Sequence, residues 1–307
     1  MTSPPSEPRL HLLNDLPRVQ VERLAFIDFR LYFLGELRRA DLIGRFRMAP
    51  AGATRDIALY REIAPSNLEF DGSPKSYGPS AVFKPLFDHV PQRVLTALSQ
   101  GFGESADKTL GALVPCEYPL ALSMPSMAVL APITRAINRG KAVALEYVSV
   151  NSGRSKRELV PLALVDTGNR WHVRAFDRKS WEFRDFVLTR MVEPVILESS
   201  PILPEETAAH DVQWNRVVDL ELVPHPGHPR LEAVCMDYNM PDGVLRVRVR
   251  AANVGYMLRR WIVDCSPDHS LTGKEYALWL KDPLVLYGAN NALVAPGYRD
   301  PKTTSRS

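Results

Sequence analysis

Several features that identify common classes of protein are missing from this sequence of 307 residues. It has three cysteines, Cys116, Cys235 and Cys265, which are odd in number and form no CxxC pair. This pattern argues against a disulfide framework or a zinc site and favours a reducing environment. The longest uncharged stretch, Tyr118 to Thr134, is interrupted by prolines and falls short of a membrane span, and the N-terminus has no apolar signal segment. We therefore expect a soluble, cytoplasmic protein that has no membrane partner.

Sequence motifs of common enzymes are also absent. The chain has no phosphate-binding GxxxxGK[ST] loop, no GxSxG elbow and no HExxH pair. His225 and His228 could share a metal ion, but the flanking prolines and the lack of a nearby carboxylate favour a loop. We expect no cofactor, no metal and no catalytic residue. A nuclease or phosphodiesterase that uses His172 is a remote alternative, because its segment offers no obvious pair of metal-binding carboxylates.

The first hundred residues show the apolar spacing of successive helices. Apolar residues recur every three or four positions from Val21 to Leu34, which predicts a helix that Gly35 ends. A short helix around residues 40–46 and a third over 51–63 follow. The alternating segment NLEFDGSPKSYGPS, with its Asp-Gly turn, then predicts a β-hairpin. This order is that of a winged helix-turn-helix, which places its last helix in the DNA major groove; a three-helix bundle with a solvated charged face is the alternative.

The expected third helix has one face suited to a core and another suited to DNA. On a helical wheel, Ala53, Ile57 and Tyr60 lie opposite Ala51, Thr54, Arg55 and Ala58, with Arg61 at the edge. Small side chains permit close approach, and arginine reads guanine edges or binds phosphates. Between Leu42 and Arg61, four arginines stand against Asp56 alone. The predicted DNA-contacting residues are Arg47, Ala51, Thr54, Arg55, Arg61, Lys75 and Tyr77.

The middle of the chain predicts a small, bent antiparallel sheet that is rich in arginine. A helix ends at Gly140, and four β-branched or aromatic segments follow, separated by polar turns. From Arg139 to Arg190 there are eleven cationic and six acidic side chains. Because this excess of positive charge exceeds what the segment can neutralise, we expect a bound anion; pairing of the arginines with nearby acids is the alternative. A further strand with Arg246, Arg248 and Arg250 on one face, and then a helix, lie in the last third of the chain.

The middle segment resembles a WYL domain. The resemblance is carried by AINRG, LEYVS, SKRELVPLALV, WHVRAFD and RDFVLTRM, in that order, over residues 127–195. His172 stands where the signature has tyrosine. The flanking segments resemble the winged helix and the C-terminal, dimer-forming domain of the BrxR- and CapW-like regulators, the repressors found beside BREX and CBASS phage-defence operons. The resemblance implies a homodimer that binds an inverted repeat in double-stranded DNA and is released by a signal at the WYL domain; an activator, or a single-strand-binding accessory of a defence effector, is the alternative.

The resemblance also implies the division of the chain and a ligand site. We expect an α+β multidomain protein with a disordered lead-in (1–17), a winged helix-turn-helix domain (18–100), a linker (101–126), a WYL domain (127–200), an α/β dimerisation domain (211–298) and a tail (299–307). The positions that match the polar groove of WYL domains, together with Arg174 in phase with His172, are Tyr147, Ser149, Arg157, His172, Arg174, Arg184 and Arg190. Guanidinium groups there suit an anionic ligand, a nucleotide or nucleic acid.

Overall fold

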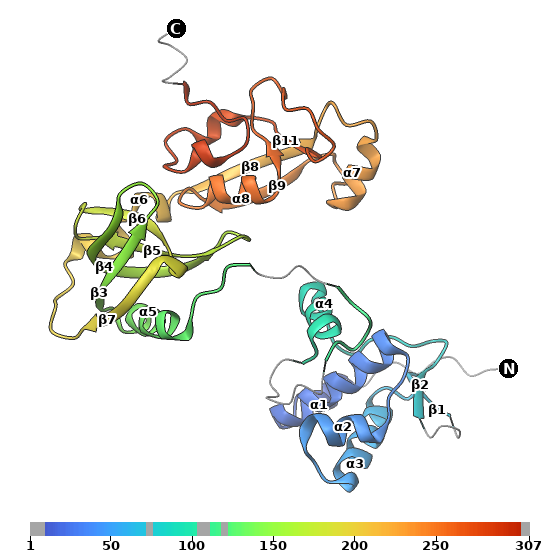
Figure 1. Ribbon diagram of the computed structural model, residues 1–307. Helices are drawn as coiled ribbons and strands as arrows, with labels where there is room; N and C mark the ends of the chain where they lie inside the picture. Colours follow the sequence, from blue (N-terminus) through green and yellow to red (C-terminus); the bar gives the residue numbers. More distant parts are fainter. Residues whose placement is uncertain (1–9, 72–75, 103–110, 118–121, 302–307) are drawn as a thin grey trace. The chain divides into compact units, whose positions relative to one another are not determined.

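The computed structural model describes residues 10–71, 76–102, 111–117 and 122–301 and divides the chain into two compact units, 1–119 and 120–307. Several predicted features lie outside the described residues: Lys75, Gly72 of the Asp-Gly turn, both ends of the chain and parts of the expected linker. Helices and sheets both occur, so the α+β class is confirmed (Figure 1). Within the described ranges, no helix is long and apolar enough to cross a membrane.

The N-terminal unit packs three helices on a shared apolar core. The elements are α1 (Arg18–Phe29), a π-helical turn (Arg30–Leu34), α2 (Arg39–Phe46), α3 (Pro50–Ile63), β1 (Leu68–Asp71), β2 (Ser76–Pro79) and α4 (Pro91–Gln100). Gly35 ends the first helix at φ 68°, where the lack of a side chain avoids strain, as the sequence predicts. β1 and β2 pair as the expected hairpin. Leu24, Ile27, Leu42 and Ile63 are fully buried between the helices.

The start of the chain differs from the expected disordered lead-in. Residues Leu10–Leu13 form a short 3₁₀ helix, and Leu12, Leu13 and Leu16 pack against the N-terminal core. The expected linker is also partly packed, because the ring of Phe102 lies 5.1 Å from those of Phe26 and Phe29. Apolar side chains in both segments therefore extend the core beyond the three helices.

A buried carboxylate ties this unit together. Asp28 on α1 is fully buried, and its Oδ1 accepts hydrogen bonds from the Tyr60 hydroxyl of α3 (2.6 Å) and the Leu86 amide (3.0 Å). Its Oδ2 lies 2.9 Å from Nε2 of His89. Burial, with the nearby Asp28 charge, raises the pKa of Tyr60, which keeps the hydroxyl protonated as a donor.

The second unit contains two sheets. The first has the strand order β6-β5-β4-β3-β7, is entirely antiparallel, and lies against α5 (Met127–Arg139). Its strands are β3 (Ala142–Ser149), β4 (Gly153–Asp166), β5 (Trp171–Asp177), β6 (Glu182–Val187) and β7 (Met191–Leu197). A register shift at Pro161 lets the long central strand β4 tolerate a residue that cannot donate to the ladder. This is the bent sheet that the sequence predicts.

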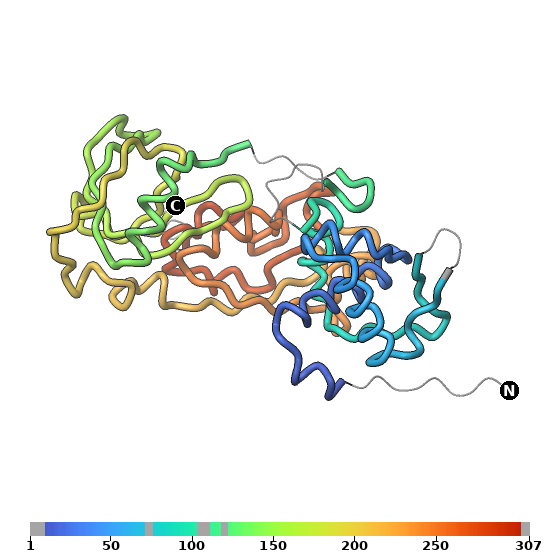
Figure 2. The backbone as a smooth tube through the Cα atoms, turned by 90° about the horizontal axis from the view of Figure 1, so that it is seen from below, coloured from blue at the N-terminus to red at the C-terminus, as the bar shows by residue number. Residues whose placement is uncertain are grey.

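The chain leaves β7 through two 3₁₀ turns (Pro204–Glu206 and Ala208–His210) and the short helix α6 (Val212–Asn215), and then enters the second sheet (Figure 2). The second sheet has the order β10-β11-β8-β9. Its elements are β8 (Val217–Pro224), α7 (Leu231–Asp237), β9 (Leu245–Arg250), α8 (Val254–Arg260), β10 (Val263–Asp264), β11 (Leu278–Leu280) and two further 3₁₀ turns (Pro283–Leu286 and Ala292–Val294). Val218, Leu220, Leu222 and Leu258 are buried in its core.

We expect Asp28→Ala to destabilise the N-terminal unit by about 3 kcal/mol, because it leaves the Tyr60 hydroxyl and the Leu86 amide without their buried acceptor. All five tryptophans follow residue 170, so tryptophan fluorescence reports only the second unit, whereas circular dichroism reports both. Denaturant unfolding should therefore show an earlier transition by circular dichroism and an unchanged one by fluorescence. The control Asp15→Ala removes an exposed carboxylate and should change neither transition. An unchanged circular dichroism transition in Asp28→Ala would contradict this assignment.

Candidate nucleic-acid interface and sensor site

The helix α3 presents the predicted face to solvent. It follows α2 after a turn of three residues, 47–49, the connection typical of a helix-turn-helix, and Pro50 begins it without losing a backbone hydrogen bond. Ala53, Ile57 and Tyr60 are buried, while Ala51, Thr54, Arg55, Ala58 and Arg61 are exposed. The division of the helix into two faces is therefore as the wheel predicts.

The acid within this basic segment is turned away from the exposed face. Asp56 is buried, and its Oδ2 lies 2.5 Å from Nε of Arg23 on α1, while its Oδ1 accepts a hydrogen bond of 3.0 Å from Gln20. Arg47, Arg55 and Arg61 form no ion pair with any described residue. Their positive charge is therefore available to an external anion such as a DNA phosphate.

Two contacts extend this exposed face. Nη1 of Arg39, on the preceding helix, donates to the Thr54 hydroxyl across 3.4 Å. The sequence reasoning missed Arg39; its place at the start of α2, the helix preceding α3, was the available signal. In the hairpin, the guanidinium of Arg61 lies over the Tyr77 ring at 5.7 Å, and the Tyr77 backbone pairs with Leu37 in both directions at 2.8 Å. Tyr77 thus anchors the wing as well as lying beside α3.

The predicted ligand residues of the sheet do not gather on one face. Paired residues on neighbouring strands share a face. Leu145 pairs with Arg157 and Ala175 with Arg184, and Leu145 and Ala175 belong to the core beneath α5. Arg174 instead pairs with Asp185, on the opposite face. Tyr147 and Ser149 share the strand phase of Leu145, whereas His172 shares that of Arg174.

On the α5 side, most of these side chains already have partners. The Tyr147 hydroxyl is buried and accepts the Val187 amide at 3.1 Å. Arg157 pairs with the buried Asp177 at 2.6 Å. The exposed Arg184 pairs with Glu182 at 2.7 Å, and the Ser149 hydroxyl accepts from the backbone of the following turn.

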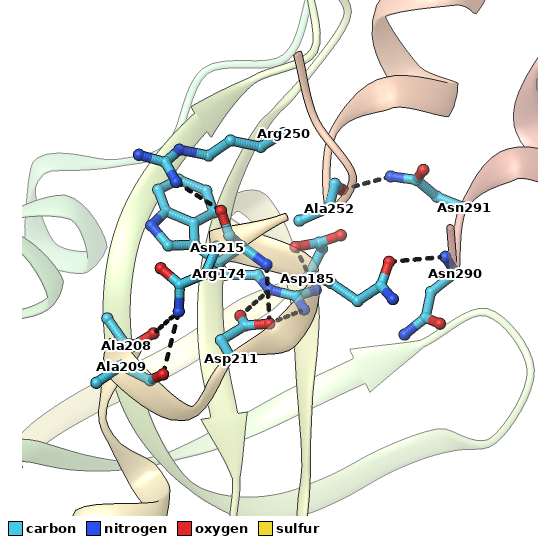
Figure 3. A network of polar contacts seen from close by, with 12 residues as sticks. Arg174, Asp185, Ala208, Ala209, Asp211, Asn215, Arg250, Ala252, Asn290 and Asn291 are labelled. Carbon is cyan, nitrogen blue, oxygen red and sulfur yellow. Dashed lines mark hydrogen bonds and ion pairs between the residues drawn. The ribbon is translucent and has the colours of Figure 1, made fainter. Parts of the chain in front are cut away.

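On the other face, Arg174 is almost completely buried and links three segments of the second unit. Its Nε and Nη2 donate to the carboxylate of Asp211 at 2.7 and 3.0 Å, and its Nη1 donates to Asp185 at 3.2 Å (Figure 3). Burial acts to lower the pKa of Arg174, but the two carboxylates outweigh it and raise the pKa. Asp211 in turn caps α6 by accepting the Trp214 amide. Arg174 therefore links β5, β6 and the segment that connects the WYL domain to the C-terminal domain.

His172 lies next to this network, at the position of the signature tyrosine. Its ring stacks on Tyr256 of α8, with centroids 5.5 Å apart and planes inclined by 21°. The Tyr256 hydroxyl donates to Asp185 at 3.2 Å. Burial lowers the pKa of His172, so the ring is neutral near pH 7, although Asp185 and the Arg170 backbone oppose this shift. Nδ1 of His172 is buried and makes no hydrogen bond with the described residues.

Comparison with protein-family models divides the chain into three matched regions. Residues 20–100 match the winged helix-turn-helix domain of the BrxR transcriptional regulator, residues 128–196 match the WYL domain, and residues 217–286 match the C-terminal dimerization domain of the BrxR regulator. The DNA-binding transcriptional repressor CapW of Escherichia coli (strain KTE188) is 33% identical over 249 residues, which cover 78% of this chain and 81% of the relative. The chain belongs to the CapW family of transcriptional repressors.

Other relatives and structures were found. The CapW repressors of Pseudomonas aeruginosa and Stenotrophomonas maltophilia are each 32% identical, over 78% of this chain and 81% and 82% of theirs. A solved structure, the proteasome accessory factor B/C (PafBC) of Arthrobacter aurescens, matches 95% of this chain and about half (49%) of its own, at 16% identity. Its TM-score of 0.24 means that it carries no argument about the fold.

Membership of the CapW family confirms two predictions. The resemblance to BrxR- and CapW-like regulators is confirmed along most of the chain. The expectation that the protein is not an enzyme is confirmed, because this is a family of DNA-binding regulators. His225, the candidate for a metal ligand, is buried and engaged, with Nε2 3.1 Å from Asp264 and Nδ1 accepting the Gly227 amide.

In this CapW-family chain, the excess of cationic side chains in the sheet is reduced by acids that lie beyond Arg190. Asp211 pairs with Arg174, Glu206 with Arg178 at 2.6 Å, and Glu198 with Arg139 at 2.8 Å. These acids lie outside residues 139–190, so the positive charge that remains for a bound anion is smaller than the excess of cationic side chains in that segment suggests. Arg170 and Arg190 form no ion pair within the described parts of the chain.

We expect Asp211→Ala to destabilise the second unit by about 3–5 kcal/mol, because it leaves the buried Arg174 guanidinium with one weak partner. Tryptophan fluorescence during urea unfolding measures this directly, since every tryptophan lies in this unit. The matched control is Asp219→Ala, which breaks an exposed pair with Arg248 at 3.1 Å and should cost less than about 1 kcal/mol. Equal effects of the two substitutions would refute a structural role for the buried pair.

Proposed function

We propose that the protein acts as a homodimeric repressor that binds an inverted-repeat operator upstream of a phage-defence operon and is released by an anionic ligand at its WYL domain. The observation that carries this proposal is the exposed face of α3, which combines small residues with Arg55 and Arg61 while its acid is turned inward. Such a face can enter the major groove closely and bind both bases and phosphates.

The two-fold symmetry of a homodimer predicts the form of its operator. Residues 217–286 match a dimerization domain, so the proposed homodimer presents two copies of α3. Two recognition helices related by a two-fold axis read a pseudo-palindrome whose half-sites are spaced by whole turns of DNA. In this proposal Arg47 and Arg61 bind the DNA phosphate backbone, and Thr54 and Arg55 contact the bases. Lys75 and Tyr77, from the hairpin segment, add contacts to the DNA backbone.

Control by a ligand requires reciprocal coupling. A ligand that weakens operator binding must itself bind more weakly, by the same factor, when the operator is bound. The alternative role, a single-strand-binding accessory, would need free arginines on the sheet, and several of these are paired. The names of the relatives favour repression over activation.

The experiment that tests the proposal is a footprint of the purified protein on the DNA upstream of its own gene, across a series of salt concentrations. A protected inverted repeat, with affinity falling steeply as salt rises, would support dimeric operator binding. Weak retardation that is uniform along the DNA would contradict it and make the sheet the first site to test against single-stranded nucleic acid.

We expect Arg55→Ala to weaken operator binding by about 1–3 kcal/mol and to relax the preference for one base in each half-site, because a guanidinium that reads guanine is lost. Competition with operators mutated at single positions measures both effects. The control Arg18→Ala removes a solvent-exposed arginine of α1 and should change neither. An equal loss on every DNA sequence would instead make Arg55 a phosphate contact.

A further inference from the structure

A polar cleft lies between the turn that joins β4 to β5 and the end of α8. Its volume is about 220 Å³, and its polar lining includes Asn169, Arg170, His172, Tyr256, Arg259 and Arg260. Arg170 and His172 come from the WYL domain, whereas Tyr256, Arg259 and Arg260 come from the region that matches the dimerization domain. Of the seven ligand residues predicted from the sequence, only His172 lines this cleft.

Two of the three arginines that line this cleft have no acidic partner among the described residues. Three guanidinium groups line it, and Asp166 is the acid that the structure places near them, 3.8 Å from Nη1 of Arg260. Arg170 and Arg259 are exposed and make no ion pair within the described ranges. Guanidinium groups that have no ion pair, such as those of Arg170 and Arg259, provide the donors that a phosphate group accepts in pairs.

The local backbone is shaped around one of these arginines. Gly168 has φ +84°, and a Cβ at this position would lie 2.7 Å from Cδ and Nε of Arg260. The glycine therefore permits both the tight turn and the passage of the Arg260 side chain across it. This arrangement places a side chain of the C-terminal domain directly over the β4–β5 turn.

His172 adds a buried polar side chain to the wall of the cleft. His172 is 8% exposed and lines the cleft, and its buried Nδ1 has no hydrogen-bond partner in the described structure. Buried polar atoms are rarely left without a partner, because an unmade hydrogen bond costs about 1–3 kcal/mol. Arginines at the end of α8 also suit the negative end of the helix dipole, but this does not explain Arg170, which belongs to the β4–β5 turn.

The larger cavity near Arg157 suits an anion less well. It has a volume of about 600 Å³, and its charged lining comprises Glu146, Glu158 and Glu193 against Lys156 and Arg157. Arg157 is moreover paired with Asp177. The cleft at α8 is therefore the better anion site, and its volume, below the roughly 300–1,000 Å³ of pockets that enclose a drug-sized ligand, suits one charged group of a ligand.

We propose that this cleft binds a terminal phosphate group, held by Arg170 of the WYL domain together with Arg259 and Arg260 of the C-terminal domain. The phosphate bridges the two domains, so its binding acts on their junction. Only the regulatory consequence of this binding rests on the proposed function; the binding itself does not. The phosphate belongs either to a free nucleotide or to the end of a nucleic-acid strand, and the experiment separates these sources.

The experiment is isothermal titration of the full-length protein with a nucleoside monophosphate, the matching nucleoside, and a short single strand with and without a 5′-phosphate. The phosphorylated probes should bind, and the matching probes without the phosphate should bind at least tenfold more weakly. Binding of the monophosphate assigns a free nucleotide, whereas binding of the phosphorylated strand alone assigns a strand end. Equal binding with and without the phosphate, or no binding by any probe, would overturn the proposal.

Variants locate the site. Arg170→Gln and Arg259→Gln should each weaken phosphate binding about tenfold, the loss expected for one charge-assisted hydrogen bond. The matched control Arg248→Gln changes an arginine of β9 that is 77% exposed and distant in the sheet, and it should have no effect. Equal weakening by all three, or none by the first two, would show that the phosphate is not held in this cleft.

A footprint of the same variants on the operator DNA separates the proposal of phosphate binding in the cleft from the proposed repressor function. None of the cleft residues lies in the N-terminal unit, so the Arg259→Gln protein should still protect the operator and should lose only its response to the phosphate. Protection of the operator without any phosphate binding would overturn the cleft and leave the repressor function standing.

Discussion

The second unit depends on the burial of one positive charge. Burial of a guanidinium is strongly unfavourable unless it is paired, and all three nitrogens of Arg174 donate to carboxylates, which come from two different parts of the chain. Asp185 belongs to the neighbouring strand, but Asp211 belongs to the segment that leads into the second sheet. The WYL sheet therefore pairs its buried guanidinium with a carboxylate from outside the sheet, and residues 120–307 form one compact unit.

Side-chain contacts also connect the WYL domain to the region that matches the dimerization domain. His172 contacts Tyr256, Tyr256 donates to Asp185, and Asp185 accepts from Arg174, so β5 and α8 share a continuous set of polar contacts. Burial raises the pKa of Asp185 even though Arg174 acts to lower it, and both side chains are largely shielded from solvent. In such surroundings electrostatic interactions are strong, and a charge added nearby acts on both domains at once.

The sequence predicted the helices and strands and their buried faces well, but it predicted the ion-pair partners of the arginines less well. Helix α3 and its buried Ile57 and Tyr60 followed from a period of 3.6, and the strands followed from alternation, because both patterns are local. The partners of Arg174 and Arg178 were missed because their acids lie outside the counted segment and meet the sheet only in the folded chain. For the same reason Arg259 and Arg260 carried no sequence signal as neighbours of His172. The ordered Leu10–Leu13 turn was missed because its leucines pack on a core that their own spacing does not reveal.

In the turn before α3, a strained backbone position coincides with a proposed DNA contact. Arg47 occupies the left-handed region at φ 48°, a conformation that glycine or asparagine adopts at lower cost. A selection for thermal stability alone would favour glycine there and remove a positive charge from the proposed DNA-contacting surface. Ancestral or consensus redesign of this turn would thus produce a more stable protein that dissociates from DNA at lower ionic strength.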